Sequence, residues 1–477
     1  MSDEANSGAL LVAIIGAGPA AFYAADALLR DGPAGTRVDM FDRLPTPFGL
    51  VRHGVAPDHQ KIKTVTKAFA QVADDPRFRF FGNVEFGRDF SLDDVQRHYH
   101  QVLFATGAQT DRRMGIPGED LRGSHPATAF VAWYNGHPDF QECQFDLSHE
   151  SVAVVGVGNV AIDVARILCL SRDELEQTDM PRHVIEVLAA SRVRRVSLLG
   201  RRGPAQAAFT NPELKELGNL DEAALVIRPE EAVLDDLSRA ELEAGGDRML
   251  QRKVEMIQEL AAREPSEKER RLFLRFLVSP VEIIDDGSGA AAAIRMVRNR
   301  LVATESGALA AEATGECETI EAGLVFRSVG YRGVPLPGVP FHERWGIILN
   351  QGGRVLDDVS GRQLRGMYAS GWIKRGPSGV IGTNKPDSVE TVAAMLEDAA
   401  AYWTFEPATL AVGGIPALLR SRGVRYVTFE DWRRIDRAEI AMGVSEGRPR
   451  AKICSVEEML ACLDGAGGDE AKVARAG

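Results

Sequence analysis

The fold can be inferred from residues 9–42, which read ALLVAIIGAGPAAFYAADALLRDGPAGTRVDMFD. Residues 9–15 form an apolar run of strand length, which is typical of a parallel strand buried on both faces. The alanine-rich segment Ala20 to Arg30 favours a helix, and residues 37–42 favour a second strand. This order predicts one strand–helix–strand unit, the building block of a dinucleotide-binding domain.

The same pattern recurs about 140 positions later in the chain. Residues 151–155 (SVAVV) predict a buried strand, and residues 156–161 (GVGNVA) predict a turn that opens a helix running to about Leu170. Residues 195–199 (RVSLL) predict the next strand. Two copies of the unit imply two nucleotide-binding domains.

The predicted fold class is therefore α/β, with two Rossmann-like three-layer dinucleotide-binding domains, one inserted into the other. We expect the first domain to comprise residues 9–107 and 325–404, and the inserted domain to comprise residues 108–324. Residues 405–477 are expected to form a C-terminal extension, to which the sequence assigns no role.

Further elements are expected around these two units. Residues 101–107 (QVLFATG) predict a strand that ends at a glycine turn. Later in the chain we expect a charged helical stretch at about 239–264 and strands over residues 273–284, 293–303 and 366–372. A final helix is expected over residues 386–403.

Composition excludes several classes of protein. The formal net charge of -12 disfavours nonspecific binding to nucleic acid or anionic membranes. Residues 8–25 are nearly uncharged, but Asp3 and Glu4 precede them where a signal peptide needs basic residues, so we expect a cytoplasmic protein without membrane contact. The five cysteines stand singly and form no C-x-x-C, so neither a metal site nor a dithiol redox pair is expected.

The first glycine turn follows the Gly16-x-Gly18-x-x-Ala21 pattern. Gly16 permits the tight turn, Gly18 lets a pyrophosphate approach the backbone, and Ala21 lets helix and sheet pack closely. Asp42 stands at the end of the second strand, where a carboxylate can accept hydrogen bonds from a ribose diol. The alternative is a surface aspartate that merely ends a strand.

The second turn, at residues 156–161, differs at the equivalent strand end, where Arg201 and Arg202 replace the acid. A guanidinium pair would bind a 2′-phosphate, whereas a carboxylate would repel it. The first site should therefore take a nucleotide with a free ribose diol, and the second a 2′-phosphorylated one. The alternative is that both arginines belong to a solvated basic stretch beginning at Arg192.

Other motifs accompany the two turns: PTPFGLVR at 45–52, APDH at 56–59, FATG at 104–107, GNVAID at 158–163, GRRGP at 200–204 and GWIKRGP at 371–377. In this order and spacing, they resemble the adrenodoxin reductase type of ferredoxin-NADP reductase, over residues 11 to about 400. The resemblance implies FAD in the first domain and NADPH in the second. It also implies hydride transfer to the flavin, followed by single electrons to an iron–sulfur protein.

The turns and the resemblance together give two sets of expected cofactor contacts. The residues expected to bind FAD are Gly16, Gly18, Pro19, Ala20, Asp42, Gly49, Leu50, Val84, Ala105, Thr106, Gly107, Trp372, Gly379, Val380 and Ile381. The residues expected to bind NADP are Gly156, Gly158, Asn159, Val160, Arg201, Arg202, Glu213, Trp372 and Gly379.

His59 and Asp163 are the expected polar pair near the hydride path, because the resemblance implies such a pair around a water network at the flavin. Asp58 is expected to cap a helix, with His59 in its first turn. Asp163 is expected one helical turn after Asn159, on the same helix face. Hydride transfer needs no protein base, because the cofactors carry that chemistry.

The expected partner is an iron–sulfur ferredoxin, acidic in character, or a flavodoxin, and the protein itself is expected to be a monomer or weak homodimer. The candidate docking residues are Lys215, Arg248, Arg252 and Lys253, with the cations Lys268, Arg270 and Arg271 nearby in sequence. Three alternatives remain open: a flavin subunit similar to the glutamate synthase small subunit, a flavin monooxygenase, and an NADP-binding sensor without turnover.

Overall fold

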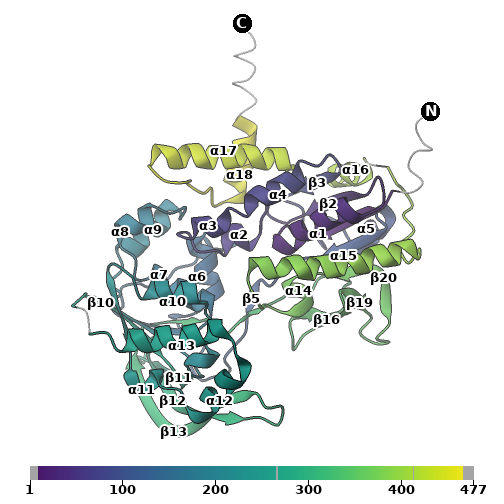
Figure 1. Cartoon of the computed structure of the whole chain (residues 1–477). Coiled ribbons are helices and arrows are strands. Elements are labelled where there is room, and N and C mark those ends of the chain that lie inside the picture. The colour runs from purple at the N-terminus through teal and green to yellow at the C-terminus, as the bar shows by residue number, and fades with distance from the viewer. Residues whose placement is uncertain (1–8, 265–266, 412, 466–477) are drawn as a thin grey trace, which may run out of the picture. The chain divides into compact units, whose positions relative to one another are not determined.

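The computed structural model describes residues 9–264, 267–411 and 413–465, and Figure 1 shows its helices and strands. The chain divides into two compact units. The first comprises the residues up to Thr110, Asn135–Pro138 and the chain from Tyr331 onward; the second comprises Asp111–Tyr134 and Asp139–Gly330. Each unit has its own parallel sheet joined by helices, which confirms the predicted α/β class.

The first unit is built on a seven-stranded sheet with the order β18-β19-β20-β4-β1-β2-β3. Its parallel strands are β1 (Leu11–Ile15), β2 (Arg37–Phe41), β3 (Phe78–Phe81), β4 (Gln101–Phe104) and β20 (Gln363–Ala369). Two antiparallel strands, β19 (Arg354–Leu356) and β18 (Asn350–Gln351), extend one edge. Helix α1 (Pro19–Asp31) follows β1 and packs against α15 (Asn384–Ala400), as Figure 1 shows.

The continuous apolar run of β1 reflects burial of both faces of this sheet. Val12 and Ile14 pack into one hydrophobic cluster together with Phe22 of α1. Ala13 and Ile15 pack into a second cluster on the other face. Because neighbouring side chains of a strand point to opposite faces, a strand covered on both faces must be apolar at every position.

The C-terminal residues 405–465 contribute to the first unit. Their helices are α16 (Gly414–Ser421), α17 (Phe429–Ser445) and α18 (Val456–Gly465). Trp432 and Ile435 of α17 belong to the same hydrophobic cluster as β1. The fully buried Glu439 of α17 pairs with Arg52 at 2.5 Å. The last helices thus complete the core of the first unit.

The second unit is built on a six-stranded sheet with the order β6-β14-β7-β8-β10-β9. Its strands are β6 (Ser124–Pro126), β7 (Ser151–Val155), β8 (Arg195–Leu199), β9 (Ala223–Ile227), β10 (Arg270–Arg275) and β14 (Leu324–Arg327), and all their pairings are parallel. Helix α7 (Asn159–Ile167) follows β7. A separate antiparallel sheet contains β11 (Val278–Asp285), β12 (Ala291–Ala303) and β13 (Leu309–Glu321).

Two predicted segments of the second unit are each divided in the structure. The charged helical stretch expected at about 239–264 is helical and consists of two helices, α12 (Asp236–Gly245) and α13 (Arg248–Ala261). Gly246 adopts a left-handed conformation that ends α12, and the Asp247 carboxylate accepts hydrogen bonds from the first turn of α13. The strand expected over 273–284 is likewise divided between β10 and β11, on either side of Leu277, whose φ is +55°.

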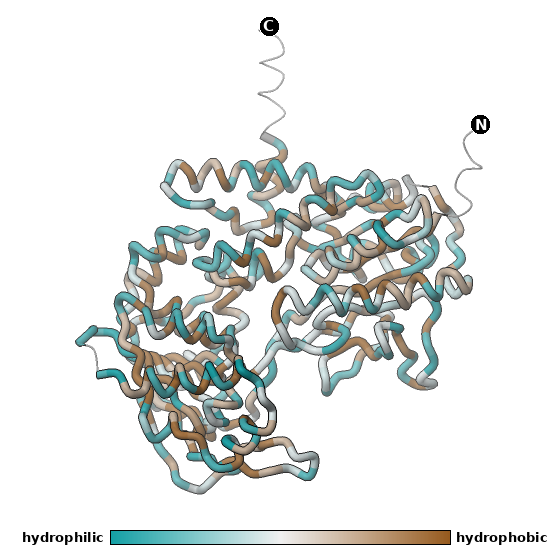
Figure 2. The backbone as a smooth tube through the Cα atoms, viewed as in Figure 1, coloured by the Kyte–Doolittle hydropathy of each residue, from teal (hydrophilic) through white to brown (hydrophobic). Residues whose placement is uncertain are grey.

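Hydropathy along the chain agrees with this layering. In Figure 2 the tube of α13 alternates between hydrophilic and hydrophobic residues, and Val254, Ile257 and Leu260 are its buried ones. In the part of the chain that the structure describes, no helix combines the length and apolar composition needed to cross a bilayer.

The remaining helices named below are α2 (Leu50–His53), α3 (Gln60–Lys63), α10 (Asn211–Leu217) and α14 (Trp372–Arg375).

Candidate cofactor-binding sites

The first glycine turn lies at the carboxyl end of β1. Gly16 has a φ of +103°, and a Cβ there would lie 2.6 Å from the Ala105 carbonyl oxygen, so only glycine fits. A Cβ on Gly18 would meet nothing within 4 Å. Helix α1 begins at Pro19, directly after this open position. The turn therefore offers an accessible backbone and a helix N-terminus, the combination that suits a phosphate.

Asp42 lies beside this turn, as its position after β2 predicts. Its Oδ2 accepts a hydrogen bond from the Ala17 N–H at 2.9 Å, and its Oδ1 accepts one from the Leu44 N–H at 3.0 Å. Its carbonyl accepts a hydrogen bond from the Val84 N–H at 2.9 Å. Burial raises the pKa of the Asp42 carboxyl above its usual value, although the two N–H donors and Arg43 oppose the shift.

Two further segments close around the same turn. A Cβ on Gly49 would lie 3.0 Å from the Gly18 Cα, and a Cβ on Gly371 would lie 2.6 Å from the Ala20 Cβ. These contacts bring the starts of α2, at Leu50, and of α14, at Trp372, to the glycine turn.

The residues after β4 complete this edge of the sheet. Thr106 and Gly107 follow the strand directly, and a Cβ on Gly107 would meet nothing within 4 Å. The Thr106 hydroxyl oxygen is buried and has no hydrogen-bond partner among the described residues. A polar atom left unpaired at the rim of an open glycine turn is consistent with a ligand that would satisfy it.

The loop from Gly376 to Ile381 is held by the predicted Trp372 and by two side chains that were not predicted as site residues, Arg375 and Asp387. Arg375 donates from Nη1 to the Ser378 Oγ at 3.0 Å and from Nη2 to the Asn384 Oδ1 at 3.0 Å. Asp387 accepts a hydrogen bond from the Gly371 N–H at 2.6 Å. Trp372 donates from Nε1 to the Ser378 carbonyl oxygen at 3.0 Å.

The ends of this loop differ in burial. Ile381 packs against the hydrophobic cluster of α1, whereas Val380 is exposed and Gly379 has a φ of +77°. The expected FAD residues therefore all lie in the first unit, and contacts join the glycine turn directly to those after β2, after β4, at α2 and at α14.

The second glycine turn repeats this geometry in the second unit. Gly156 has a φ of +127°, and a Cβ there would lie 2.2 Å from the Ser328 carbonyl oxygen. A Cβ on Gly158 would again meet nothing within 4 Å, and α7 begins at Asn159. The Asn159 Oδ1 accepts a hydrogen bond from the Thr210 N–H at 3.0 Å, and Val160 follows in the first helical turn.

The basic pair after β8 is the main difference between the two turns. Arg201 is exposed and Arg202 is half-buried, and neither guanidinium has a hydrogen-bond or ion-pair partner within residues 9–264, 267–411 and 413–465. At the end of the adjacent β10, by contrast, Arg275 is buried and pairs with Glu231 and Glu318. Arg201 and Arg202 thus remain available to an anion.

Asp163 lies on α7, where its Oδ1 accepts a hydrogen bond from the Arg166 Nη2 at 2.6 Å. Burial lowers the pKa of Arg166, although the negative charges of Glu216 and of the buried Glu213 of α10 oppose this shift. Arg166 was not among the residues predicted from the sequence, although its position one turn after Asp163 on a helix could have indicated the pair.

His59 belongs to the first unit and Asp163 to the second. The prediction that Asp58 caps the following helix is wrong, because the N-cap residue of α3 is His59. The His59 N–H is bonded to the Ala56 carbonyl oxygen at 3.0 Å in a preceding turn, so the single helical turn begins only at Gln60.

Four of the seven cations considered for partner docking form hydrogen bonds or ion pairs with other groups of the same chain. Lys253 donates to the Ala207 carbonyl oxygen and Lys268 to that of Leu220, at 2.7 and 2.5 Å. Arg270 donates to the carbonyl oxygens of Cys169 and Leu170, and Arg252 pairs with Glu255 and Glu259. Lys215, Arg248 and Arg271 are the exposed members of the set without a side-chain partner among the described residues.

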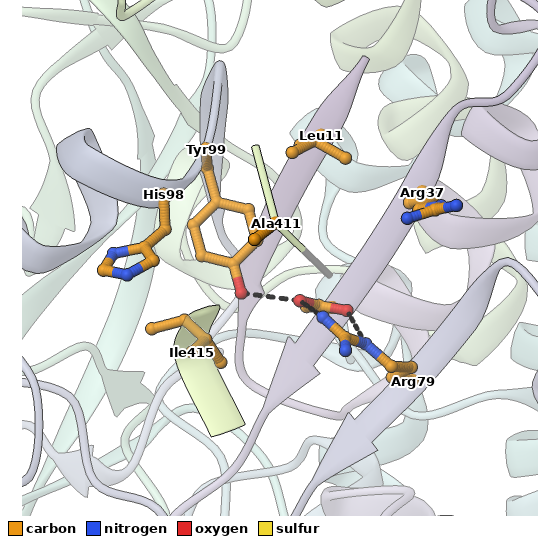
Figure 3. A pocket seen from close by; sticks show the side chains of 8 residues that line it. Leu11, Arg37, Arg79, His98, Tyr99, Ala411 and Ile415 are labelled. Carbon is orange, nitrogen blue, oxygen red and sulfur yellow. Dashed lines mark hydrogen bonds and ion pairs between the residues drawn. The ribbon is translucent and has the colours of Figure 1, made fainter. Parts of the chain in front are cut away.

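A small cavity lies at the opposite end of the first sheet, near Leu11 and Arg37, the first residues of β1 and β2 (Figure 3). Its volume is about 20 Å³, which is room for about one water molecule. Asp39 accepts hydrogen bonds there from the Tyr99 hydroxyl at 2.6 Å and from the Arg79 Nε at 2.7 Å. Its size and place exclude it as a dinucleotide site.

Comparison with known proteins places the chain among pyridine-nucleotide-dependent oxidoreductases. A family model described as pyridine nucleotide-disulphide oxidoreductase matches residues 11–198. The chain is 45% identical over 459 residues to the NADPH-ferredoxin reductase FprA of Mycobacterium tuberculosis, a match that covers 94% of this chain and 98% of that protein.

Two further comparisons extend over most of the chain. It is 43% identical over 461 residues to the mitochondrial NADPH:adrenodoxin oxidoreductase of Salvelinus fontinalis, covering 94% of this chain and 90% of that protein. The solved structure of Mycobacterium tuberculosis FprA in complex with NADPH matches with a TM-score of 0.89 and 43% identity. That match covers 96% of this chain and all of the other.

Proposed function

The chain belongs to the adrenodoxin reductase-type family of ferredoxin-NADP reductases, and on that premise we propose that it is an NADPH:ferredoxin oxidoreductase with bound FAD. When bound, the flavin would accept a hydride from NADPH and release electrons singly, which is chemistry supplied by the cofactors. The protein's part is to select, orient and separate the two nucleotides.

One observation carries this proposal: two glycine turns of the same geometry are followed by side chains of opposite charge. Gly18 and Gly158 both face open space at the start of a helix. Beside the first turn lies the Asp42 carboxylate. After the strand next to the second turn lie Arg201 and Arg202, whose guanidinium groups have no partner among the described residues. A carboxylate accepts hydrogen bonds from a ribose diol and repels a 2′-phosphate, whereas guanidinium groups bind a 2′-phosphate.

The residues around the first turn fit FAD. We propose that it is held by the glycine turn and α1, by Asp42 at a ribose, and by the segments after β2, after β4 and at α2. The buried Thr106 hydroxyl, which has no hydrogen-bond partner in the described part of the chain, supports this assignment, since it lies directly after β4 at the glycine turn. Trp372, Gly379, Val380 and Ile381 complete the proposed site, in a loop that Arg375 and Asp387 keep in place.

The residues around the second turn fit NADPH. We propose that Gly156, Gly158, Asn159 and Val160 hold the pyrophosphate and that Arg201 and Arg202 hold the 2′-phosphate. The hydrogen bond from the Thr210 N–H to the Asn159 Oδ1 fixes the orientation of the Asn159 side chain at the proposed site. Glu213, Trp372, Gly379, His59 and Asp163 remain part of the proposed site as the family resemblance implies.

The proposed electron acceptor is an acidic iron–sulfur ferredoxin. The related proteins are named NADPH-ferredoxin reductase and NADPH:adrenodoxin oxidoreductase, and these names give ferredoxin and adrenodoxin as what they act on. Lys215, Arg248 and Arg271 are the cations we propose for docking, because their side chains are exposed and not engaged by other described residues. We propose that the protein works in the cytoplasm as a monomer or weak homodimer.

The proposal is tested by spectroscopy of the purified protein. It should carry yellow flavin that NADPH bleaches under anaerobic conditions, and stopped-flow mixing with oxidised ferredoxin should then restore the flavin absorbance as the ferredoxin is reduced. A colourless preparation that cannot be reconstituted with FAD would favour the sensor. NADPH oxidation coupled to a hydroxylated product would establish a monooxygenase instead.

A further inference from the structure

The main chain that carries Arg201 and Arg202 is held by the neighbouring segment of the second unit. The Gly200 N–H donates to the Arg275 carbonyl oxygen at 2.9 Å, and the Gly200 carbonyl oxygen accepts from the Val278 N–H at 2.9 Å. The Arg202 carbonyl oxygen accepts from the Leu277 N–H at 3.1 Å. The carbonyl oxygens of Gly200 and Arg202 thus accept hydrogen bonds from backbone N–H groups, whereas no backbone N–H of the described residues donates to that of Arg201, between them.

The Arg201 carbonyl oxygen accepts its hydrogen bond from a side chain, the amide of Asn299 on β12, at 2.8 Å. Asn299 is buried, with 8% of its surface exposed. Its Nδ2 also donates to the Ser279 Oγ at 2.8 Å, and its backbone N–H donates to the Leu277 carbonyl oxygen at 2.7 Å. One residue thus binds the loop that carries the arginines and the turn that follows β10.

The turn after β10 is itself in a conformation that needs support. Leu277 has a φ of +55°, which costs free energy in a residue other than glycine and persists only where surrounding contacts impose it. The bonds from Leu277 to Arg202 and from Asn299 to Leu277 are such contacts. The backbone of Arg201 and Arg202 is therefore fixed through a chain of hydrogen bonds that ends at Asn299.

We propose that Asn299 is a specificity-determining positioning residue that fixes Arg201 and Arg202 for a 2′-phosphate. This inference rests on the proposed function. Arginine side chains lose much conformational freedom when they bind, so an anchored main chain leaves less entropy to be lost. Without the Asn299 amide, the Arg201 carbonyl oxygen loses its side-chain donor and the loop can rotate. Affinity for the 2′-phosphate should fall, while affinity for the rest of the nucleotide stays.

The test uses the FAD-containing protein with Asn299→Leu, which has a similar size but no donor. Calorimetric titrations with 2′,5′-ADP and 5′-AMP give the two dissociation constants, and steady-state ferricyanide reduction gives KM for NADPH and NADH. One lost hydrogen bond predicts a rise of roughly fivefold for 2′,5′-ADP and for the KM of NADPH. The values for 5′-AMP and NADH should stay within about twofold of wild type.

Two matched variants separate positioning from general destabilisation. Ser279→Ala removes the other acceptor of the Asn299 amide but leaves its bond to Arg201, so nucleotide selectivity should be kept. Met296 lies on β12, as Asn299 does, and its side chain is buried in a hydrophobic cluster. Met296→Ala should therefore lower the melting temperature without changing selectivity. A merely structural Asn299 would behave as Met296 does.

The outcomes distinguish this inference from the proposed function. If Asn299→Leu keeps the wild-type preference for 2′,5′-ADP while Arg201→Ala and Arg202→Ala lose it, the positioning role is wrong and the 2′-phosphate site stands. If the wild-type protein itself binds 2′,5′-ADP no better than 5′-AMP, the proposed NADPH site is wrong. Selective weakening by Asn299→Leu supports both.

Discussion

Replacing Glu439 with glutamine should weaken the attachment of α17 to α2 within the first unit and loosen the proposed FAD site. The Glu439 carboxylate is fully buried and accepts hydrogen bonds from Arg52 at 2.9 and 2.5 Å and from Arg450 at 2.9 Å. Burial alone would raise its pKa, but Arg52 and Arg450 lower it below the usual value, so the carboxylate is charged. Removing one partner of a buried ion pair costs about 3–5 kcal/mol.

The loss should reach the flavin because of where Arg52 lies. Arg52 is in α2, the single-turn helix that begins at Leu50, beside the first glycine turn. Without the Glu439 carboxylate, the buried Arg52 guanidinium loses its ion-pair partner, so the contact between α2 and α17 is weakened. We therefore expect a lower free energy of unfolding together with faster FAD release on dilution.

Urea unfolding followed by far-ultraviolet circular dichroism, together with the FAD content after desalting, measures both effects. The matched control is Arg437→Ala, on the same helix, which breaks an exposed pair with Glu430 and should cost less than about 1 kcal/mol. If Glu439→Gln unfolds at the same urea concentration as Arg437→Ala and keeps its FAD, the buried pair does not support α2 and the reasoning is refuted.

Two further predictions concern the first unit. Gly16→Ala should give protein with little FAD, because its Cβ would lie 2.6 Å from the Ala105 carbonyl oxygen at a φ of +103°; flavin absorbance per chain measures this, and Gly361→Ala, at a φ of +65° in open space, should keep its FAD. Burial, His137, Arg52, Lys452 and Arg43 lower the pKa of His53 well below its usual value. Between about pH 7 and 5 the unfolded state therefore binds a proton at His53 that the folded state does not, so the free energy of unfolding should fall as the pH decreases. The fall should be smaller in His53→Phe. Urea midpoints that change in parallel for the two proteins across that range would contradict this prediction.

The sequence predicted the parts of the fold that depend on local rules. Both glycine turns could be located because glycine is needed where φ is positive and a backbone must come close, as at Gly16 and Gly156. β1 was predicted because a strand buried on both faces must be apolar throughout. The place of Asp42 beside the turn followed from the βαβ geometry.

The parts that the sequence did not predict depend on contacts between distant residues. Asn299 reaches Arg201 from 98 positions away, and Glu439 reaches Arg52 from 387 positions away, distances that no spacing rule covers. Charge alone also gives no internal partner, and the hydrogen bonds of Lys253 and Lys268 to backbone carbonyl oxygens were not predicted. The cap of α3 was misplaced because a one-turn helix carries little periodic signal.

The most direct test compares nucleotide selection in two variants, one at each turn. Two lost charge-assisted hydrogen bonds, at about 1.5–3 kcal/mol each, predict that the Arg201→Ala, Arg202→Ala double variant binds 2′,5′-ADP more than about 100-fold more weakly while its FAD content is unchanged. Asp42→Ala should show the reverse, with less FAD and unchanged 2′,5′-ADP binding. Loss of FAD from the arginine variant, or wild-type 2′,5′-ADP affinity in it, would contradict the assignment of one nucleotide to each turn.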